Sequence, residues 1–184
     1  GNLSNDKKSG KIKTIEKQSD PQVVVKYKAT DQTHFVLGFR ALNVFDKKST
    51  ILAVLAGILG VGMSSRLFHK LREEMGVCYY VRANTDPYTD HGVFQISSGV
   101  DNKRVKEVIT AILKECNKLK DELVVEKELA KVKEIFISGI KMGLEATDDI
   151  ANFYGGQEVM VGKIESPEEK IKKIKAVTAK QVRD

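Results

Sequence analysis

The chain has no tryptophan, only three prolines and only two cysteines among its 184 residues. Two cysteines, Cys78 and Cys116, are too few for the disulfide framework of a small secreted domain, so we interpret both as packed thiols. The longest apolar run, 51–63, is also short, because a helix that spans a bilayer needs about 20 apolar residues. We therefore expect a buried helix there, no membrane partner and, since the first residues are polar, a cytoplasmic location.

The excess of positive charge is small, with a net charge of +6 from 31 basic and 25 acidic residues. A nucleic-acid-binding surface needs clustered basic side chains with interleaved aromatics, whereas the lysines here are scattered. We therefore expect no nucleic-acid partner. With 41% hydrophobic and 30% charged residues, the composition is that of one globular domain with a real core.

A metal-ligand cluster is also missing from the sequence. The three histidines are His34, His69 and His91, and none of them begins a His-x-x-Glu-His motif. A catalytic zinc needs several protein ligands and an open position for water. We predict no metal site and no cofactor on this chain. We interpret His34 as a hydrogen-bonded strand residue and His69 as a surface residue.

No nucleophile is clearly indicated. Ser64 and Ser65 precede a helix, where serine caps backbone donors. Cys78 would need an electropositive partner to be reactive, and we interpret it as a core residue. The glycines near position 60 follow a helix and lack the lysine of a phosphate-binding loop.

The hydrophobic patterns predict the secondary structure. Strands are expected at 23–28, 34–42, 79–84 and 93–98, and helices at 47–59, 64–74, 102–116, 126–144, 147–161 and 166–174. This order indicates an α+β fold, an antiparallel sheet of at least four strands with helices packed on one face. The helix residues expected to be buried against the sheet are Val105, Ile109, Ile112, Phe136 and Ile140.

The ends of the chain suggest a fragment. We divide it into a polar lead-in, 1–20, and one domain, 21–184. Thr178 and Gln181 form a capping-box pattern, which predicts the start of a helix just before the printed sequence stops. We interpret the chain as a piece of a larger protein, truncated at both ends.

The most informative stretch is 59–81. Glycines precede a short amphipathic helix, and Gly76 separates that helix from the next strand. Arg72 and Tyr79 are seven residues apart across this junction. Such a pair can hold a peptide backbone or an oxyanion. The spacing alone favours a structural alternative, a local ion pair for Arg72 and a half-buried strand position for Tyr79.

This stretch resembles the C-terminal half-domain of the insulinase/pitrilysin and mitochondrial-processing-peptidase zinc proteases, closest to the bacterial two-domain type. The matching residues are Gly60, the run Gly62-Met63-Ser64-Ser65-Arg66-Leu67-Phe68, Leu71-Arg72-Glu73, Gly76-Val77, Tyr79 and Val81. Further matches, from Val23 to the end of the chain, include Thr30-Asp31-Gln32-Thr33-His34, Gly92-Val93-Phe94, Glu128-Leu129 and Gly143-Leu144-Glu145. The sequence departs from the family pattern at Val61, where glycine is common, and at Cys78 and Tyr80, where small residues usually flank the tyrosine.

The resemblance implies a LuxS/processing-peptidase-like metallohydrolase fold. It also implies the substrate-binding half of a zinc-dependent metalloendopeptidase of the inverzincin class, inactive alone. Tyr79 would be catalytic in trans, as a donor to the oxyanion or substrate carbonyl, and Arg72, Gly60 and Gly62 would bind substrate. The implied partners are a peptide and a metal-binding domain or subunit with the His-x-x-Glu-His motif, which would carry the zinc.

A second reading stays open: a non-catalytic, protease-like structural or assembly subunit. The presence of both Arg72 and Tyr79 favours the peptidase, since a pure scaffold has no use for the pair.

Overall fold

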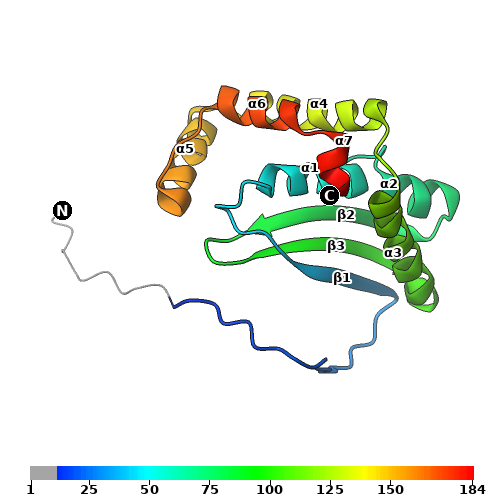
Figure 1. The fold of residues 1–184 in the computed structure, drawn as a ribbon. Coiled ribbons are helices and arrows are strands. Elements are labelled where there is room, and N and C mark those ends of the chain that lie inside the picture. Colours follow the sequence, from blue (N-terminus) through cyan, green and yellow to red (C-terminus); the bar gives the residue numbers. More distant parts are fainter. Residues whose placement is uncertain (1–11) are drawn as a thin grey trace.

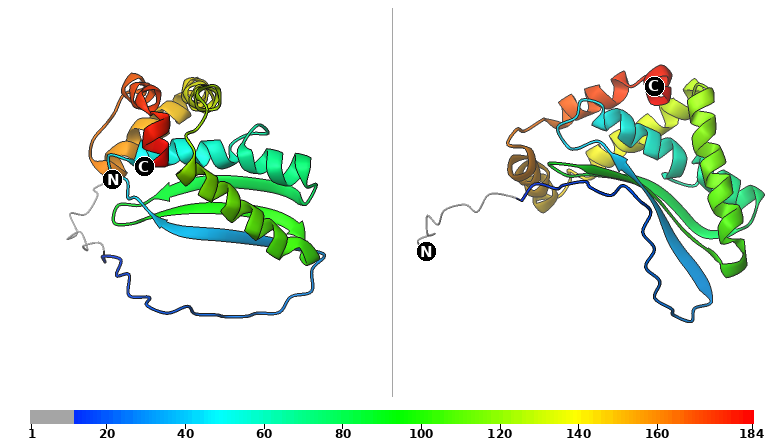
Figure 2. Two further views of the ribbon diagram at one scale, coloured as in Figure 1. Left: turned by 45° about the vertical axis from the view of Figure 1, so that its right-hand side comes forward. Right: turned by 60° about the horizontal axis from the view of Figure 1, so that its bottom comes forward.

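The computed structural model describes residues 12–184, so the first part of the predicted lead-in lies outside the described residues. The described chain forms two layers, a sheet and a set of helices that cover one of its faces (Figure 1). An extended segment, 12–31, passes the other side of the sheet and leads into the first strand (Figure 2). The predicted α+β class, an antiparallel sheet with helices on one face, is confirmed.

The sheet has three strands in the order β1-β3-β2, with both pairings antiparallel. They are β1 (Gln32–Ala41), β2 (Cys78–Pro87) and β3 (Gly92–Asp101). β2 and β3 form a hairpin, whose turn is closed by a hydrogen bond from Tyr88 N to His91 O at 2.9 Å. Because side chains alternate along a strand, one face of β3 carries the buried Phe94, Ile96 and Val100.

The helical layer is built around α1, which contacts β2 and is itself contacted by α4, α6 and α7. The elements of this layer are α1 (Ser49–Gly60), α2 (Arg66–Phe68), the π-helix η1 (His69–Glu74), the 3-10 turn η2 (Asn102–Arg104), α3 (Val105–Asp121), α4 (Glu126–Met142), α5 (Thr147–Val161), α6 (Pro167–Ala176) and α7 (Ala179–Arg183). α1 is apolar nearly all round because it lies between the sheet and the outer helices.

The core fills the space between the two layers. Its fully buried large side chains come from both, and include Ile58, Leu59, Leu67, Leu71, Ile96, Ile112 and Leu129. Of the five helix residues predicted to be buried, Ile112 is fully buried. The other four, Val105, Ile109, Phe136 and Ile140, are only partly buried. On α4 the most deeply buried positions are instead Leu129, Val132 and Ile137.

The strand predicted at 23–28 is wrong, and the described sheet therefore has three strands rather than at least four. Val23, Val24, Val25 and Tyr27 are all more than 80% exposed. These residue types favour strands, but the preference reflects packing on a pleated, half-buried surface. The segment has no hydrogen-bonded neighbour among residues 12–184 and no buried face, so propensity alone does not make it a strand.

The helix predicted at 64–74 also differs in detail, since it starts as a short α-helix and continues as η1, a π-helix. The capping box at Thr178 is confirmed, and the short α7 follows it. A second capping box, formed by Ser166 and Glu169, begins α6. None of the helices in the described part of the chain combines the length and the apolar character that crossing a membrane would require.

Candidate functional site

The junction between η1 and β2 brings Arg72 and Tyr79 together along the chain. η1 ends at Glu74, and Gly76 adopts φ +61°, a left-handed conformation that favours glycine. Val77 N then donates to Leu71 O at 2.9 Å, which closes the reversal. The prediction that Gly76 ends the helix is confirmed.

Arg72 is tied to the start of β2. Its Nη1 donates to Cys78 O at 2.8 Å, so the guanidinium is held at the peptide group that joins Cys78 to Tyr79. Most of the guanidinium donors have no partner among the described residues. The arginine is therefore positioned, exposed and still able to donate hydrogen bonds.

Tyr79 occupies a β-bulge. Cys78 pairs with Val100, and Tyr80 already pairs with Gly99, so Tyr79 is an extra residue on β2. A bulge redirects the side chain of the extra residue. The Tyr79 side chain is 56% exposed, and among the described residues its hydroxyl has no hydrogen-bond partner. Tyr79 is a strand residue with close to half of its surface covered, so its burial alone does not exclude the structural alternative.

The residues on either side of Tyr79 have structural surroundings. Tyr80 stacks on His34 with the ring centroids 5.8 Å apart, and its hydroxyl lies 3.2 Å from His34 Nδ1. Gly99 makes room for this stack, since a Cβ there would lie 2.6 Å from the Tyr80 ring. His34 is thus a strand residue with a hydrogen bond, as predicted.

Cys78 lies in the core and is not an activated nucleophile. Its side chain is 2% exposed. Burial raises the pKa of the thiol above its ordinary value, although the Arg72 charge and a hydrogen bond with Ser98 act in the opposite direction. A thiol with a raised pKa is mostly protonated at neutral pH and a poor nucleophile. The interpretation of Cys78 as a core residue is confirmed.

The two glycines predicted to bind substrate lie in different surroundings. Gly60, at the end of α1, is buried against β2, and a Cβ there would lie 2.1 Å from Ala83 N. It allows close contact between the helix and the strand. Gly62 is exposed, with φ +79°, and only Ile135 would come within 4 Å of a Cβ there.

The serine-arginine part of the motif has a structural explanation that the sequence did not reveal. Ser65 is the N-cap residue of α2, but its hydroxyl donates to Gly62 O at 2.8 Å and does not cap the helix, so the capping prediction is wrong for this side chain. Arg66 forms a two-pronged ion pair with Glu128 of α4, with both N–O distances at 2.8 Å. This pair, partly buried, fastens α2 to α4. The hydrogen bond to Glu128 raises the pKa of Arg66 further.

The histidines are dispersed over the molecule. His69 is exposed beside Glu73 and Glu74, and His91 lies 2.9 Å from an Asp90 carboxylate oxygen. Within residues 12–184, no three histidine, cysteine, aspartate or glutamate side chains are grouped in a way that could hold a metal ion. The described residues therefore do not fit a zinc site, and no step of catalysis can be derived through a metal held by them.

Comparisons with known proteins agree with this arrangement. Residues 1–136 match the family described as the peptidase M16 inactive domain. The chain belongs to this family.

Its relatives include an uncharacterized zinc protease of Bacillus subtilis, YmxG, which is 31% identical over 174 residues. That match covers 94% of this chain and 42% of the relative. An uncharacterized zinc protease of Streptomyces coelicolor is 30% identical, with 84% of this chain and 34% of the relative covered. The chain thus spans less than half the length of these relatives.

Solved structures share the fold. A protease from Helicobacter pylori superposes with a TM-score of 0.77 at 19% identity, covering 84% of this chain and 37% of that one. A peptidase M16 inactive domain from Pseudomonas fluorescens gives 0.75 at 20% identity, with the same coverage. A chain of complex III₂ from Candida albicans gives 0.74 at 18% identity, covering 84% and 39%. At these identities the likeness shows the fold alone.

Proposed function

We propose that this chain is the substrate-binding half of a zinc-dependent metalloendopeptidase and that it completes the active site of a separate metal-binding half. The observation that carries the proposal is the hydrogen bond from Arg72 to Cys78 O, which holds an exposed arginine next to an exposed tyrosine on a bulge. Family membership and the names of the relatives, zinc proteases, support it. The zinc, its ligands and the general base belong to the other half.

Tyr79 is the oxyanion donor in this proposal. When water attacks a peptide carbonyl, negative charge develops on the carbonyl oxygen, and a prepositioned O–H donor stabilises that charge. The Tyr79 hydroxyl suits this task because it is exposed and unpartnered within the described residues. The bulge and the backbone reversal at Gly76 fix the backbone from which this side chain projects.

Arg72 binds the peptide. A guanidinium presents five N–H donors in a rigid fork, and the bond to Cys78 O uses only part of that capacity. The remaining donors have no partner within residues 12–184 and can bind substrate carbonyls. Of the two glycines, exposed Gly62 offers its backbone directly, whereas buried Gly60 acts by letting the end of α1 approach β2.

The test uses the complete, zinc-loaded enzyme and a peptide substrate. Removal of one oxyanion donor costs roughly 10²–10³ in kcat, so Tyr79→Phe should lower kcat by about that factor with zinc content unchanged. Arg72→Ala should mainly raise KM, because it removes binding to a peptide that is held equally before and during reaction.

Tyr80→Phe is the matched control, since it removes a neighbouring hydroxyl that is occupied by His34. It should leave kcat close to wild type. Full activity in both the Tyr79 and Arg72 variants would show that the pair is structural and would contradict the proposal.

A second candidate is a non-catalytic structural subunit. The fold shared with a chain of complex III₂ supports it, because that chain is part of a multi-chain complex. An assembly that forms equally well with Arg72→Ala and Tyr79→Phe, in a protein without peptidase activity, would favour this alternative.

A further inference from the structure

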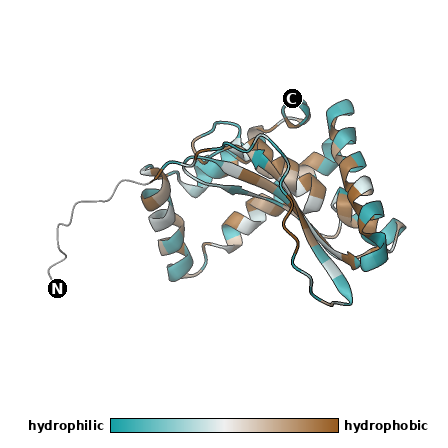
Figure 3. Ribbon diagram, turned by 90° about the horizontal axis from the view of Figure 1, so that it is seen from below, coloured by the Kyte–Doolittle hydropathy of each residue, from teal (hydrophilic) through white to brown (hydrophobic). Residues whose placement is uncertain are grey.

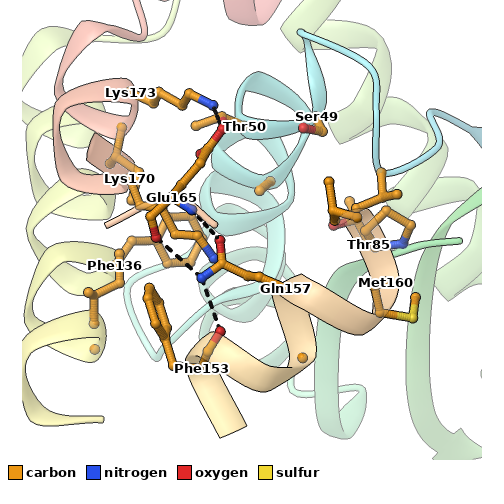
Figure 4. Close-up of a pocket in the computed structure, with 18 of the residues that line it drawn as sticks. Ser49, Thr50, Thr85, Phe136, Phe153, Gln157, Met160, Glu165, Lys170 and Lys173 are labelled. Atoms are coloured by element: carbon orange, nitrogen blue, oxygen red, sulfur yellow. Dashed lines mark hydrogen bonds and ion pairs between the residues drawn. The ribbon is translucent and has the colours of Figure 1, made fainter. Parts of the chain in front are cut away.

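A large cavity is lined by many residues of the helical layer and by Thr85 and Pro87 at the end of β2 (Figure 4). Arg72 and Tyr79 lie before and at the start of the same strand. The volume of the cavity is about 1180 Å³. It is open to solvent on one side and is bordered by the start of α1, the C-terminal half of α4, one side of α5, the first turns of α6, and the end of β2 at Thr85 and Pro87. Of these elements only β2 also takes part in the candidate site, because Tyr79 lies at its start.

The cavity is mainly apolar. Its aromatic and aliphatic lining comes from three helices: Phe136, Ile140 and Leu144 on or just after α4, Phe153 and Met160 on α5, and Ile174 on α6. Apolar surface that stays in contact with water is unfavourable, at about 25 cal/mol per Å². A ligand that covered this lining would recover that free energy.

One wall, α5, is packed loosely. None of its 15 residues is buried, and polar and apolar residues are mixed along it in the view from below, where it lies at the left (Figure 3). Its main polar tie is Gln157, whose side-chain nitrogen donates to Phe153 O and Glu165 O and whose oxygen accepts from Glu165 N at 3.0 Å. These bonds join α5 to the loop that follows it, at Glu165.

The polar part of the lining is positive. It contains four lysines, Lys47, Lys163, Lys170 and Lys173, and two carboxylates, Asp46 and Glu165. Glu165 is paired with Lys173, and Asp46 accepts from Lys48 N at 2.7 Å. Lys47, Lys163 and Lys170 have no carboxylate within ion-pair distance among the described residues.

Lys170 lies where the apolar and positive parts of the cavity meet. Its Nζ is 4.4 Å from the centroid of the Phe153 ring. Burial lowers the pKa of this ammonium group, with Glu165 raising it and Lys173 lowering it. A partly buried cation with no direct carboxylate partner is a site at which an anionic ligand group would be stabilised.

We propose that this cavity binds a long-chain fatty acid, with the hydrocarbon chain against the apolar lining and the carboxylate beside Lys170. Ligand pockets usually measure about 300–1,000 Å³, so a cavity of this volume takes a whole organic molecule and would be left mostly empty by a simple ion. The cationic residues select an anionic head group. This proposal is independent of the peptidase function, because the cavity and the Arg72–Tyr79 pair share no residue.

Titration with a fluorescent polyene fatty acid tests the proposal directly. Fluorescence should rise on binding and should be reversed by a saturated fatty acid. The alcohol with the same hydrocarbon chain should compete about tenfold more weakly, because it lacks the charge. Equal competition by the alcohol would overturn the role of the lysines.

Two neighbouring glycines of α5 give a matched pair of variants. A Cβ at Gly155 or at Gly156 meets no heavy atom within 4 Å, but only Gly156 lines the cavity. Gly156→Phe should therefore fill the cavity and weaken probe binding at least about tenfold, while Gly155→Phe should bind like wild type. Equal binding by the two variants would place the probe elsewhere and overturn the proposal.

Charge is tested by a second pair on α6. Lys170→Gln should weaken binding of the fatty acid about three- to tenfold and leave binding of the alcohol unchanged. Lys172→Gln, at an exposed position outside the lining, should change neither. This pair keeps the test decisive if the phenylalanine variants fail to fold.

The same titration on the longest natural form of the polypeptide distinguishes a cavity that binds fatty acid from one that is covered by another segment of the same protein. Binding in both forms supports the proposal. Binding to residues 1–184 alone, lost in the longer form, would show that an apolar segment of the same protein covers the cavity, and would overturn it.

Discussion

The two ends of β2 are built in opposite ways. At its first residues, the backbone is fixed by the bulge and by the bond from Arg72 to Cys78 O, and exposed polar groups project from a rigid frame. At its last residues, Thr85 and Pro87 border a large apolar cavity whose wall, α5, has no buried residue. A rigid frame suits groups that must be placed accurately, whereas a loosely packed wall suits a ligand that varies in shape.

The comparison predicts that substitutions in the tightly packed part of the molecule, along the first half and middle of β2, cost more stability than similar substitutions at the cavity end. Gly60→Ala has the largest expected effect, because the new Cβ would lie 2.1 Å from Ala83 N, a backbone atom that cannot rotate away. We expect a loss of about 2–3 kcal/mol in the free energy of unfolding. Urea denaturation measures it, and an unchanged midpoint would show that α1 is not held tightly against β2.

The second-largest loss of stability is expected when the ion pair between Arg66 and Glu128 is broken. Its side chains are 18% and 25% exposed, and it joins α2 to α4 close to the Arg72 junction. Arg66→Ala should lower the free energy of unfolding by about 1–3 kcal/mol, since it leaves a partly buried carboxylate without its partner.

The matched control for that pair is Arg104→Ala. Arg104 makes the same two-pronged contact, with Glu107, but on the exposed surface. Exposed pairs contribute little, so no measurable change is expected. Equal losses in the two variants would mean that burial does not distinguish the pairs.

At the cavity end, a substitution should raise the free energy of unfolding rather than lower it. Gly156→Ala places a methyl group in open space within a helix, and alanine is the better helix former. The free energy of unfolding should rise by about 0.5–1 kcal/mol. A loss of stability would show that α5 packs more tightly than the structure indicates.

Addition or removal of zinc should have the smallest effect on the stability of this chain. Neither end of β2, nor any other part of the described chain, gathers three possible ligands. A ligand that binds only the folded state raises Tm, so zinc or a chelator should leave the Tm of this chain unchanged. Close to one tightly held zinc per chain, in a metal analysis of purified protein, would contradict the prediction.

The sequence predicted most of the fold because its long periodic segments are locally consistent. α3, α4, α5 and the β2–β3 hairpin all lie close to their predicted ranges. The segment 23–28 failed because strand formation depends on a neighbour that propensity does not supply.

The site was predicted less completely. The seven-residue spacing and Gly76 indicated that Arg72 and Tyr79 could lie close together, but neither the bulge nor the bond to Cys78 O has a sequence signal. Arg66 and Glu128 are 62 residues apart, so their pairing appears only when α4 is placed against α2. The cavity likewise depends on how four helices and a strand end meet.

The bulge also affects how the chain can evolve. Cys78 pairs with Val100 and Tyr80 with Gly99, so the strand would continue in unbroken alternation if residue 79 were absent. Tyr79 is in effect an insertion into a sheet that is complete without it. The residue at this position can therefore be gained, lost or replaced without a change in the pairing register of the hairpin. A single-residue deletion at 79 would remove the phenol and leave every later pairing of β2 with β3 in place.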